Sequence, residues 1–357
     1  MSQDLSLEMR INRILLGATE RSRVYDMLAL LLENRVLLNE ALAEMYGVFS
    51  QGGKKKNAQA VMLYDCHSSV SEGKSFGEAL KAWVKPEESS LIVAGEASGN
   101  LRQAFNDVME LIDAKKRIFG AVVGNALYPI LLFAVFCILL YIVSTRLVPA
   151  LSGSIPPEHW QGSAKMLYWM SEFTTHFGLL SLVLLAITVL GVSFSMPYLR
   201  GNLRFRLDKL PPWSVYRAVQ GATFLLNVAA MVKSGIKLYD ALDMLAKNAN
   251  PYLKERIEAA LHGIAKGYNL GEALEDAEYD FPDPEAIRLI KVLASRDGFD
   301  AALTRYAKAW LDTAISKVKA AMGVFFIVAI VAVGACGAIV ISAGTELQDA
   351  VERQYSR

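Results

Sequence analysis

Hydrophobic residues are concentrated in three long blocks of this chain. Residues 118–143, 178–196 and 322–341 contain no charged side chain and are rich in aliphatic residues. A helix needs about 20 apolar residues to cross a bilayer, and buried helices of soluble proteins rarely exclude charge over such lengths. The pattern therefore predicts three transmembrane helices.

The basic residues that flank these blocks predict the orientation. Loops on the cytoplasmic side of a membrane carry an excess of Lys and Arg. Residues 144–177 and 342–357 together hold only four of the 37 basic residues. We therefore expect these two segments to lie outside the membrane and both large polar regions, with the N-terminus, to be cytoplasmic. The flanking residues on the cytoplasmic side include Lys115, Lys116, Arg117, Arg200, Arg204, Arg206, Lys209, Lys317 and Lys319.

The two polar regions repeat one sequence pattern. Residues 73–80 read Gly-Lys-Ser-Phe-Gly-Glu-Ala-Leu and residues 267–274 read Gly-Tyr-Asn-Leu-Gly-Glu-Ala-Leu, so five of eight positions are identical. Upstream, Val-Leu-Leu-Asn-Glu-Ala-Leu at 36–42 matches Ile-Lys-Leu-Tyr-Asp-Ala-Leu at 236–242. Self-similarity of this kind indicates a duplicated domain.

Local signals in both copies are helical. Ser75 and Asn269 suit helix N-caps, and Pro86 and Pro284 suit a first helical turn. The chain has no alternating run of β-branched residues, so a sheet is not expected. The sequence predicts an all-α protein with two homologous cytoplasmic bundles of about six helices each and three transmembrane helices. The glycines that suit left-handed helix ends are Gly73, Gly267, Gly99 and Gly298.

These patterns divide the chain into nine predicted segments. In order they are an N-terminal arm (1–20), the first cytoplasmic domain (21–117), a transmembrane helix (118–143), a periplasmic loop (144–177), a second transmembrane helix (178–196), a cytoplasmic linker (197–216), the second cytoplasmic domain (217–321), a third transmembrane helix (322–341) and a periplasmic tail (342–357).

Composition narrows the function further. The net charge of +1 gives no reason to expect nucleic-acid binding. The three cysteines lack the spacing of a metal site, and we expect no metal, cofactor or catalytic residues. Gly73-Lys74-Ser75 resembles the end of a phosphate-binding loop. That loop needs a further glycine where Ser68 stands, so a helix cap explains these residues better.

The most specific motif is Gly95-Glu-Ala-Ser-Gly-Asn-Leu101, which resembles the Gly-Glu-x-Ser-Gly-x-Leu signature of the PilC/GspF family. Tyr128-Pro129 is similar to a Tyr-Pro pair found in the first span of that family. The resemblance covers residues 21–342. The residues of this signature turn are Gly95, Glu96, Ser98, Gly99 and Leu101, and a structural role is favoured for them over contact with an ATPase or another partner.

The second copy departs from the signature. It reads Ala294-Ser-Arg-Asp-Gly-Phe-Asp300, so Asp297 and Gly298 are the equivalents of a turn that has lost its glutamate. With the short tail, this divergence suggests a specialised pilus branch, such as a toxin-coregulated, bundle-forming or conjugative thin pilus.

Several residues have both a structural and a functional interpretation. Ser98 could cap the next helix and Glu96 could bind backbone amides, or the turn could face an ATPase or a cation. Seven acidic residues within 272–285 favour a solvated face over a docking surface. In the first span, Gly120, Gly124 and Asn125 permit close helix packing, and Pro129 should kink the helix. With Tyr128 they could contact either a pilin helix or the protein itself.

The resemblance implies a platform that couples a hexameric secretion ATPase to pilin or pseudopilin insertion. It also implies a bacterial inner-membrane location, self-association into a homo-oligomer and contacts with other inner-membrane assembly proteins. A membrane-tethered adaptor outside secretion remains the alternative. A transporter is disfavoured because the predicted spans contain no charge.

Overall fold

The computed structural model describes residues 7–153, 155–295 and 298–355, and every regular element in these ranges is helical. The chain divides into two compact units. The first combines the chain up to Phe119 with Tyr198–Ile315, and the second combines Gly120–Pro197 with the chain from Ser316. The all-α prediction is therefore confirmed for the described residues.

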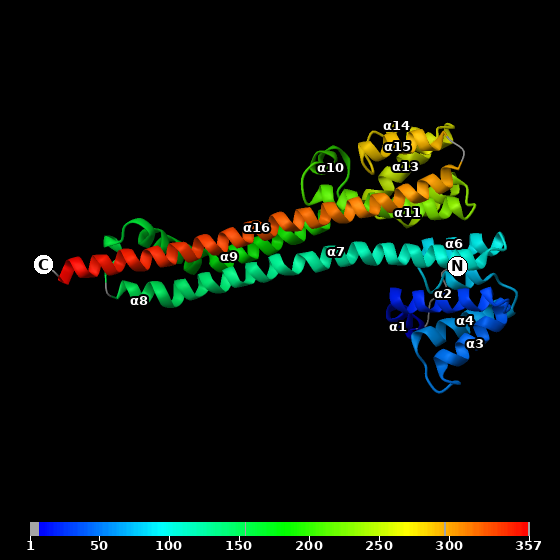
Figure 1. Cartoon of the computed structure of the whole chain (residues 1–357), viewed down its shortest axis with the longest axis horizontal. Helices are drawn as coiled ribbons and strands as arrows, with labels where there is room; N and C mark the ends of the chain where they lie inside the picture. Colours follow the sequence, from blue (N-terminus) through cyan, green and yellow to red (C-terminus); the bar gives the residue numbers. More distant parts are fainter. Residues whose placement is uncertain (1–6, 154, 296–297, 356–357) are drawn as a thin grey trace. The chain divides into compact units, whose positions relative to one another are not determined.

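Both copies of the repeat lie in the first unit and share one order of helices (Figure 1). The first copy contains α1 (Leu7–Leu15), α2 (Ala18–Glu33), α3 (Leu38–Ser50), α4 (Ala58–Ser71), α5 (Phe76–Leu80), α6 (Pro86–Ala97) and the start of α7 (Leu101–Ile142). The second contains α11 (Trp213–Lys233), α12 (Leu238–Asn248), α13 (Pro251–Ala265), α14 (Leu270–Asp276), α15 (Pro284–Ala294) and the start of α16 (Phe299–Tyr355), preceded by α10 (Gly201–Leu207). Helices α2–α7 thus correspond to α11–α16, which supports the predicted duplication.

The predicted helix boundaries follow from their cap residues. The hydroxyl of Ser75 accepts the N–H of Glu78 at 3.2 Å, and Asn269 accepts the N–H of Glu272 at 3.0 Å. The glycines at 73, 99, 267 and 298 all have a positive φ, between 71° and 91°. Glycine is the residue that adopts this conformation without strain, so these positions end helices as expected.

The second unit is more helical than the sequence predicts. A π-turn (Val143–Leu147), α8 (Val148–Ser152) and a short 3₁₀ helix (Pro157–His159) continue beyond α7, and α9 covers Gly162–Tyr198. The predicted loop is therefore largely helical, and the predicted tail continues α16 as far as Tyr355. The physical reason is a small core that gives these segments something to pack against. It contains Val143, Val148, Ile155, Trp160, Ala164, Leu167, Ala343 and Leu347.

Two hydrogen bonds connect the segments around this core. The indole N–H of Trp160, which is 3% exposed, donates to the carbonyl of Ile155 at 3.0 Å. The carboxylate of Glu346 on α16 accepts the N–H of Ala164 at 3.1 Å, at the start of α9. This arrangement satisfies a backbone donor that a helix start leaves open. Trp160 therefore packs inside the protein, whereas Trp169 is exposed.

Within the described residues, four helical stretches are long and apolar enough to cross a membrane: Leu101–Ser152, Gly162–Tyr198, Trp213–Lys233 and Phe299–Asp349. They differ in how much of the apolar stretch the protein itself covers. In Trp213–Lys233, 56% of the most apolar window is buried, against 6%, 0% and 6% in the other three. Helix α11 is thus a core helix of the second bundle, which the sequence analysis also placed outside the membrane.

Candidate functional site

The signature turn joins α6 to α7. The N–H of Asn100 donates to the carbonyl of Gly95 at 2.8 Å, and the N–H of Gly99 donates to that of Glu96 at 3.1 Å. These bonds, with a φ of 71° at Gly99, close the C-terminus of α6 in the manner of a Schellman motif. The tip from Ala97 to Asn100 is exposed.

Two of the signature residues face inward. The carboxylate of Glu96 accepts the N–H groups of Phe76 at 2.9 Å and Gly77 at 3.0 Å, at the start of α5. A Cβ on Gly95 would lie 2.2 Å from the Cβ of Ala104 on α7. Gly95 and Glu96 therefore hold α5, α6 and α7 together, which is the structural interpretation of the motif.

Ser98 does not cap α7, contrary to the possibility raised above. Its hydroxyl donates to the carbonyl of Gly95 at 3.2 Å. The reason is that Ser98 is the C-cap of α6, so its side chain reaches back along that helix. Leu101 begins α7 and is half-buried against the core.

The repeated Gly-Glu-Ala-Leu also has a packing role in both copies. A Cβ on Gly77 would lie 2.7 Å from the backbone nitrogen of Val93 on α6. A Cβ on Gly271 would lie 2.2 Å from the backbone nitrogen of Lys291 on α15. Since no side chain fits at these distances, glycine lets the two short helices lie directly on their neighbours.

The second copy replaces the glutamate contact with a local one. The second copy has one more residue between the proline and the glycine, so Ser295 stands where Glu96 does only when the turn is counted back from Gly298. The hydroxyl of Ser295 donates to the carbonyl of Lys291 at 3.1 Å. The start of α14 is closed instead by a capping box, in which Glu272 accepts the N–H of Asn269 at 3.1 Å. Asp297 lies outside the described residues, and Gly298 keeps the positive φ of 74°.

A surface groove lies beside the signature turn. The exposed ion pair between Arg102 and Glu33, at 3.1 Å, crosses it from α7 to α2. Exposed pairs of this kind contribute little to stability, so the pair leaves both side chains available to a partner. The groove is lined by Leu32, Glu33, Gly99, Asn100, Leu101 and Arg102.

The two copies are joined by ion pairs from α7. Asp107, which is 5% exposed, accepts the ammonium group of Lys233 on α11 at 2.7 Å. Lys308 on α16 pairs with Glu110, and Arg117 pairs with Asp312. Helix α6 contacts α11 and α12 as well. These ion pairs could not be predicted from the sequence, because their partners are 126 to 198 residues apart.

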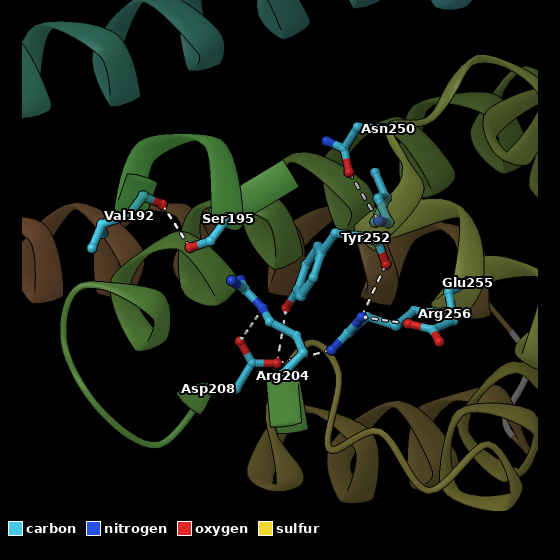
Figure 2. A network of polar contacts seen from close by, with 9 residues as sticks. Val192, Ser195, Arg204, Asp208, Asn250, Tyr252, Glu255 and Arg256 are labelled. Carbon is cyan, nitrogen blue, oxygen red and sulfur yellow. Dashed lines mark hydrogen bonds and ion pairs between the residues drawn. The ribbon is translucent and has the colours of Figure 1, made fainter. Parts of the chain in front are cut away.

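A buried ionic network anchors α10 to the second bundle (Figure 2). The carboxylate of Asp208 forms ion pairs with the guanidinium groups of Arg204 at 3.1 Å and Arg256 at 2.9 Å. Arg204 and Asp208 are fully buried. The guanidinium carbons of Arg204 and Arg256 lie 4.3 and 3.6 Å from the ring centroid of Tyr252. Burial and the neighbouring Asp208 raise the pKa of Tyr252, which therefore stays protonated and donates to Asp208 at 3.4 Å.

Arg204 was interpreted above only as a basic residue that flanks the membrane. The sequence signal for its burial is its position between apolar residues in Asn-Leu-Arg-Phe-Arg-Leu, from 202 to 207. Arg204 is fully buried, whereas Arg206 in the same helix is exposed. The helix therefore presents a charged residue to the bundle, where it pairs with Asp208, and Asp208 also pairs with Arg256.

The candidate residues of the first span lie in the second unit. A Cβ on Gly120 or Gly124 would meet nothing within 4 Å. Asn125 donates to the carbonyl of Ala121 at 2.6 Å, within its own helix. Tyr128 packs edge-on against Phe326 of α16, with ring centroids 6.4 Å apart. A groove there is lined by Asn125, Tyr128, Pro129, Lys319, Met322, Gly323 and Phe326.

Most of the remaining polar motifs have local partners. Gly73 ends α4 and Lys74 forms a surface pair with Glu72, so Gly-Lys-Ser belongs to a helix junction. In the acidic run, Glu275 pairs with Lys291, Asp276 pairs with Lys266, and Asp283 caps α15. Among the described residues, no three His, Cys, Asp or Glu side chains are grouped so as to hold a metal.

Comparison with known families matches both halves of the chain. The model of the family described as type II secretion system (T2SS), protein F, matches residues 24–149 and again residues 224–345. Each match begins in the first long helix of one copy and extends beyond the start of a long apolar helix. The two matches therefore follow the duplication seen in the structure.

Three curated relatives come from pilus and secretion systems. The toxin coregulated pilus biosynthesis protein E of Vibrio cholerae is 22% identical over 258 residues, which cover 71% of this chain and 75% of that protein. The type IV pilus assembly protein PilC of Myxococcus xanthus is 25% identical over 277 residues, covering 72% and 64%. The type II secretion system protein F of Aeromonas hydrophila is 25% identical over 270 residues, covering 72% and 68%.

Proposed function

Because the chain belongs to the family of type II secretion system protein F, we propose that it is the inner-membrane platform of a type IV pilus or type II secretion machine. It would couple a cytoplasmic secretion ATPase to the insertion of pilins or pseudopilins, without catalysing a reaction itself. The observation that carries this proposal is the family match over both copies, which covers most of the chain.

The proposed topology has three spans. The apolar helices α7, α9 and α16 bury almost none of their apolar stretches within the chain, so a bilayer is their natural environment. Helix α11 stays in the second cytoplasmic bundle, because that bundle covers its apolar face. The distribution of Lys and Arg supports a cytoplasmic N-terminus and a periplasmic C-terminus.

The exposed half of the signature turn is the proposed contact for the ATPase. Gly95 and Glu96 are used inside the bundle, whereas Ser98, Gly99 and Asn100 form an exposed tip beside the Arg102–Glu33 pair. A partner that binds this groove would contact α6 and α7 together. Since α7 continues into the first proposed span, motion at the turn would reach the membrane along one helix.

The first span offers a proposed contact for pilins. Gly120 and Gly124 face open space, and Tyr128, Pro129 and Asn125 line a groove with α16. Small residues allow a second helix to approach closely in a bilayer. An apolar pilin helix would therefore fit against this face, and the protein's own self-association is the competing use of it.

Affinity purification from the native host in mild detergent, followed by mass spectrometry, tests the proposal. Co-purification of a hexameric secretion ATPase and pilin-like proteins is the expected result. Recovery of the protein alone, or with transport proteins only, would contradict it and favour an adaptor outside secretion. The purified protein should also lack ATPase activity.

A further inference from the structure

The two copies contact each other through different helices, α6 in the first copy and α11 with α12 in the second. The equivalent helices are α15 in the second copy and α2 with α3 in the first. Helix α6 of the first copy packs on α11 and α12 of the second, and Leu91 on α6 is fully buried. The equivalent of α6 in the second copy is α15. With Pro86 and Pro284 aligned as first helical residues, Leu91 corresponds to Leu289, which is 41% exposed.

The exposed face of α15 extends beyond this leucine. Val292 corresponds to the half-buried Ala94 and is 58% exposed, and Arg288 is exposed as well. Ala286, Ile287 and Ile290, in contrast, are buried in their own bundle. Helix α15 is therefore packed on its inner side and bears an uncovered apolar strip, Leu289 and Val292, at the positions of Leu91 and Ala94 in α6.

The complementary surface is uncovered in the first copy. Leu226 and Ala230 of α11 line a small cleft against Asp107 of α7. Their counterparts on α2 are Asp26 and Leu30, since residues 36–42 align with 236–242. Leu30 is 59% exposed and Asp26 is exposed, whereas Leu226 is 8% exposed.

We infer that α15 of one chain docks on α2 and α3 of a second copy of this chain, repeating between chains the contact that α6 makes with α11 and α12 within it. This inference rests on the proposed self-association and specifies its surfaces. Each chain offers one surface of each kind, so the interface is heterologous and chains add head to tail. Such an arrangement closes into a ring or continues as an open array.

The charges on the two surfaces are complementary at one position. Arg288 on the α15 surface carries a charge opposite to that of Asp26 on the α2 surface, and neither has an ion-pair partner among the described residues. The pair of Lys233 with Asp107 would not recur, because its counterparts are Glu33 and Tyr306 and Glu33 is paired with Arg102 of its own chain.

Directional cross-linking of the full chain tests the inference. One tagged chain carries Leu30→Cys and a differently tagged chain carries Leu289→Cys, both with Cys137→Ala, because Cys66 and Cys336 are buried. The two are co-expressed, and membranes are treated with a short bismaleimide. We expect an adduct between the two tags and no adduct within one tag. A chain with Tyr64→Cys, on α4 and outside both surfaces, replaces Leu30→Cys as the control and should give none.

A second measurement excludes an effect of the cysteines. Val292→Asp should reduce the mass of the purified protein in nanodiscs to that of a smaller species, whereas Tyr64→Asp should leave the mass unchanged. Adducts between two Leu30→Cys chains, adducts with another protein only, or no adduct would overturn the inference. If the ATPase and pilins still co-purify in that case, the proposed function stands and the docking surfaces alone are wrong.

Discussion

The carboxylate of Glu96 accepts the backbone N–H of Gly77 at 3.0 Å, and this contact ties the end of α6 to the start of α5. It joins the signature turn to the Gly-Glu-Ala-Leu repeat, two motifs about 20 residues apart in the sequence. A carboxylate at a helix N-terminus is favoured both by hydrogen bonding and by the helix dipole. The charge of Glu96 therefore serves the fold of the first bundle.

Replacing Glu96 should destabilise the first bundle. Glu96→Gln keeps one acceptor but loses the charge, and we expect a loss of about 1–2 kcal/mol. Glu96→Ala leaves both amides of α5 without this acceptor and should cost about 2–3 kcal/mol. The measurement is the Tm of the purified full chain in detergent. Glu78→Gln is the control, because Glu78 forms only an exposed pair with Lys81. An equal Tm for the Glu96 and Glu78 variants would argue against the contact.

The repeated glycines should tolerate no side chain. In Gly271→Ala, the new Cβ would lie 2.2 Å from backbone atoms of Lys291, so α14 and α15 must move apart. Overpacking of this kind costs about 1–3 kcal/mol, and the Tm should fall.

Gly47→Ala is the matched control for this substitution. Gly47 lies in α3 with nothing within 4 Å of an added Cβ. Alanine is the better helix former, so this variant should gain about 0.5–1 kcal/mol. A stable Gly271→Ala protein would show that the two helices are not held at the distance described.

Neutralising Asp208 should unfold the attachment of α10. Asp208→Asn leaves the guanidinium groups of Arg204 and Arg256 buried without their counter-charge, and such a change costs about 3–5 kcal/mol. The expected result is a much lower Tm and faster proteolysis between α9 and α11. Asp243→Asn is the control. It breaks an exposed pair with Lys247 and should change the free energy of unfolding by less than about 0.5 kcal/mol.

The sequence predicted the elements whose signals are local. Ser75, Asn269, Pro86 and Pro284 cap or begin helices as expected, because each acts on backbone groups within a few residues. The target of Glu96 could not be predicted, since the α5 amides reach it only when the bundle has folded. The divergence of the second copy was visible, but its consequence, the capping box at Asn269, was not.

Two other features depend on tertiary contacts in the same way. Polar residues in 144–177 and 342–357, and the prolines in the first of these segments, favour a loop. Most of their described residues are nevertheless helical, because Trp160 and Leu347 share a core. Arg204 looked like a membrane-flanking charge, and its burial depends on Asp208 and on Arg256, which lies 52 residues further along the chain. In each case, the partner that determines the structure is distant in sequence.

The tip of the signature turn should affect partner binding and leave folding intact. Arg102→Glu replaces the exposed pair with Glu33 by a repulsion, and Asn100→Asp adds a charge to an exposed position. We expect both variants to change the free energy of unfolding by less than about 0.5 kcal/mol and to reduce the amount of ATPase recovered by affinity purification.

The control is Lys81→Glu, an exposed charge reversal at the end of α5, which should change neither stability nor ATPase recovery. The contrast with Glu96→Gln is the decisive comparison, because that variant should lower the Tm first and ATPase recovery only as the bundle unfolds. If Arg102→Glu and Asn100→Asp leave ATPase recovery at the wild-type level, the ATPase binds elsewhere on the cytoplasmic domains and the signature turn acts only in folding.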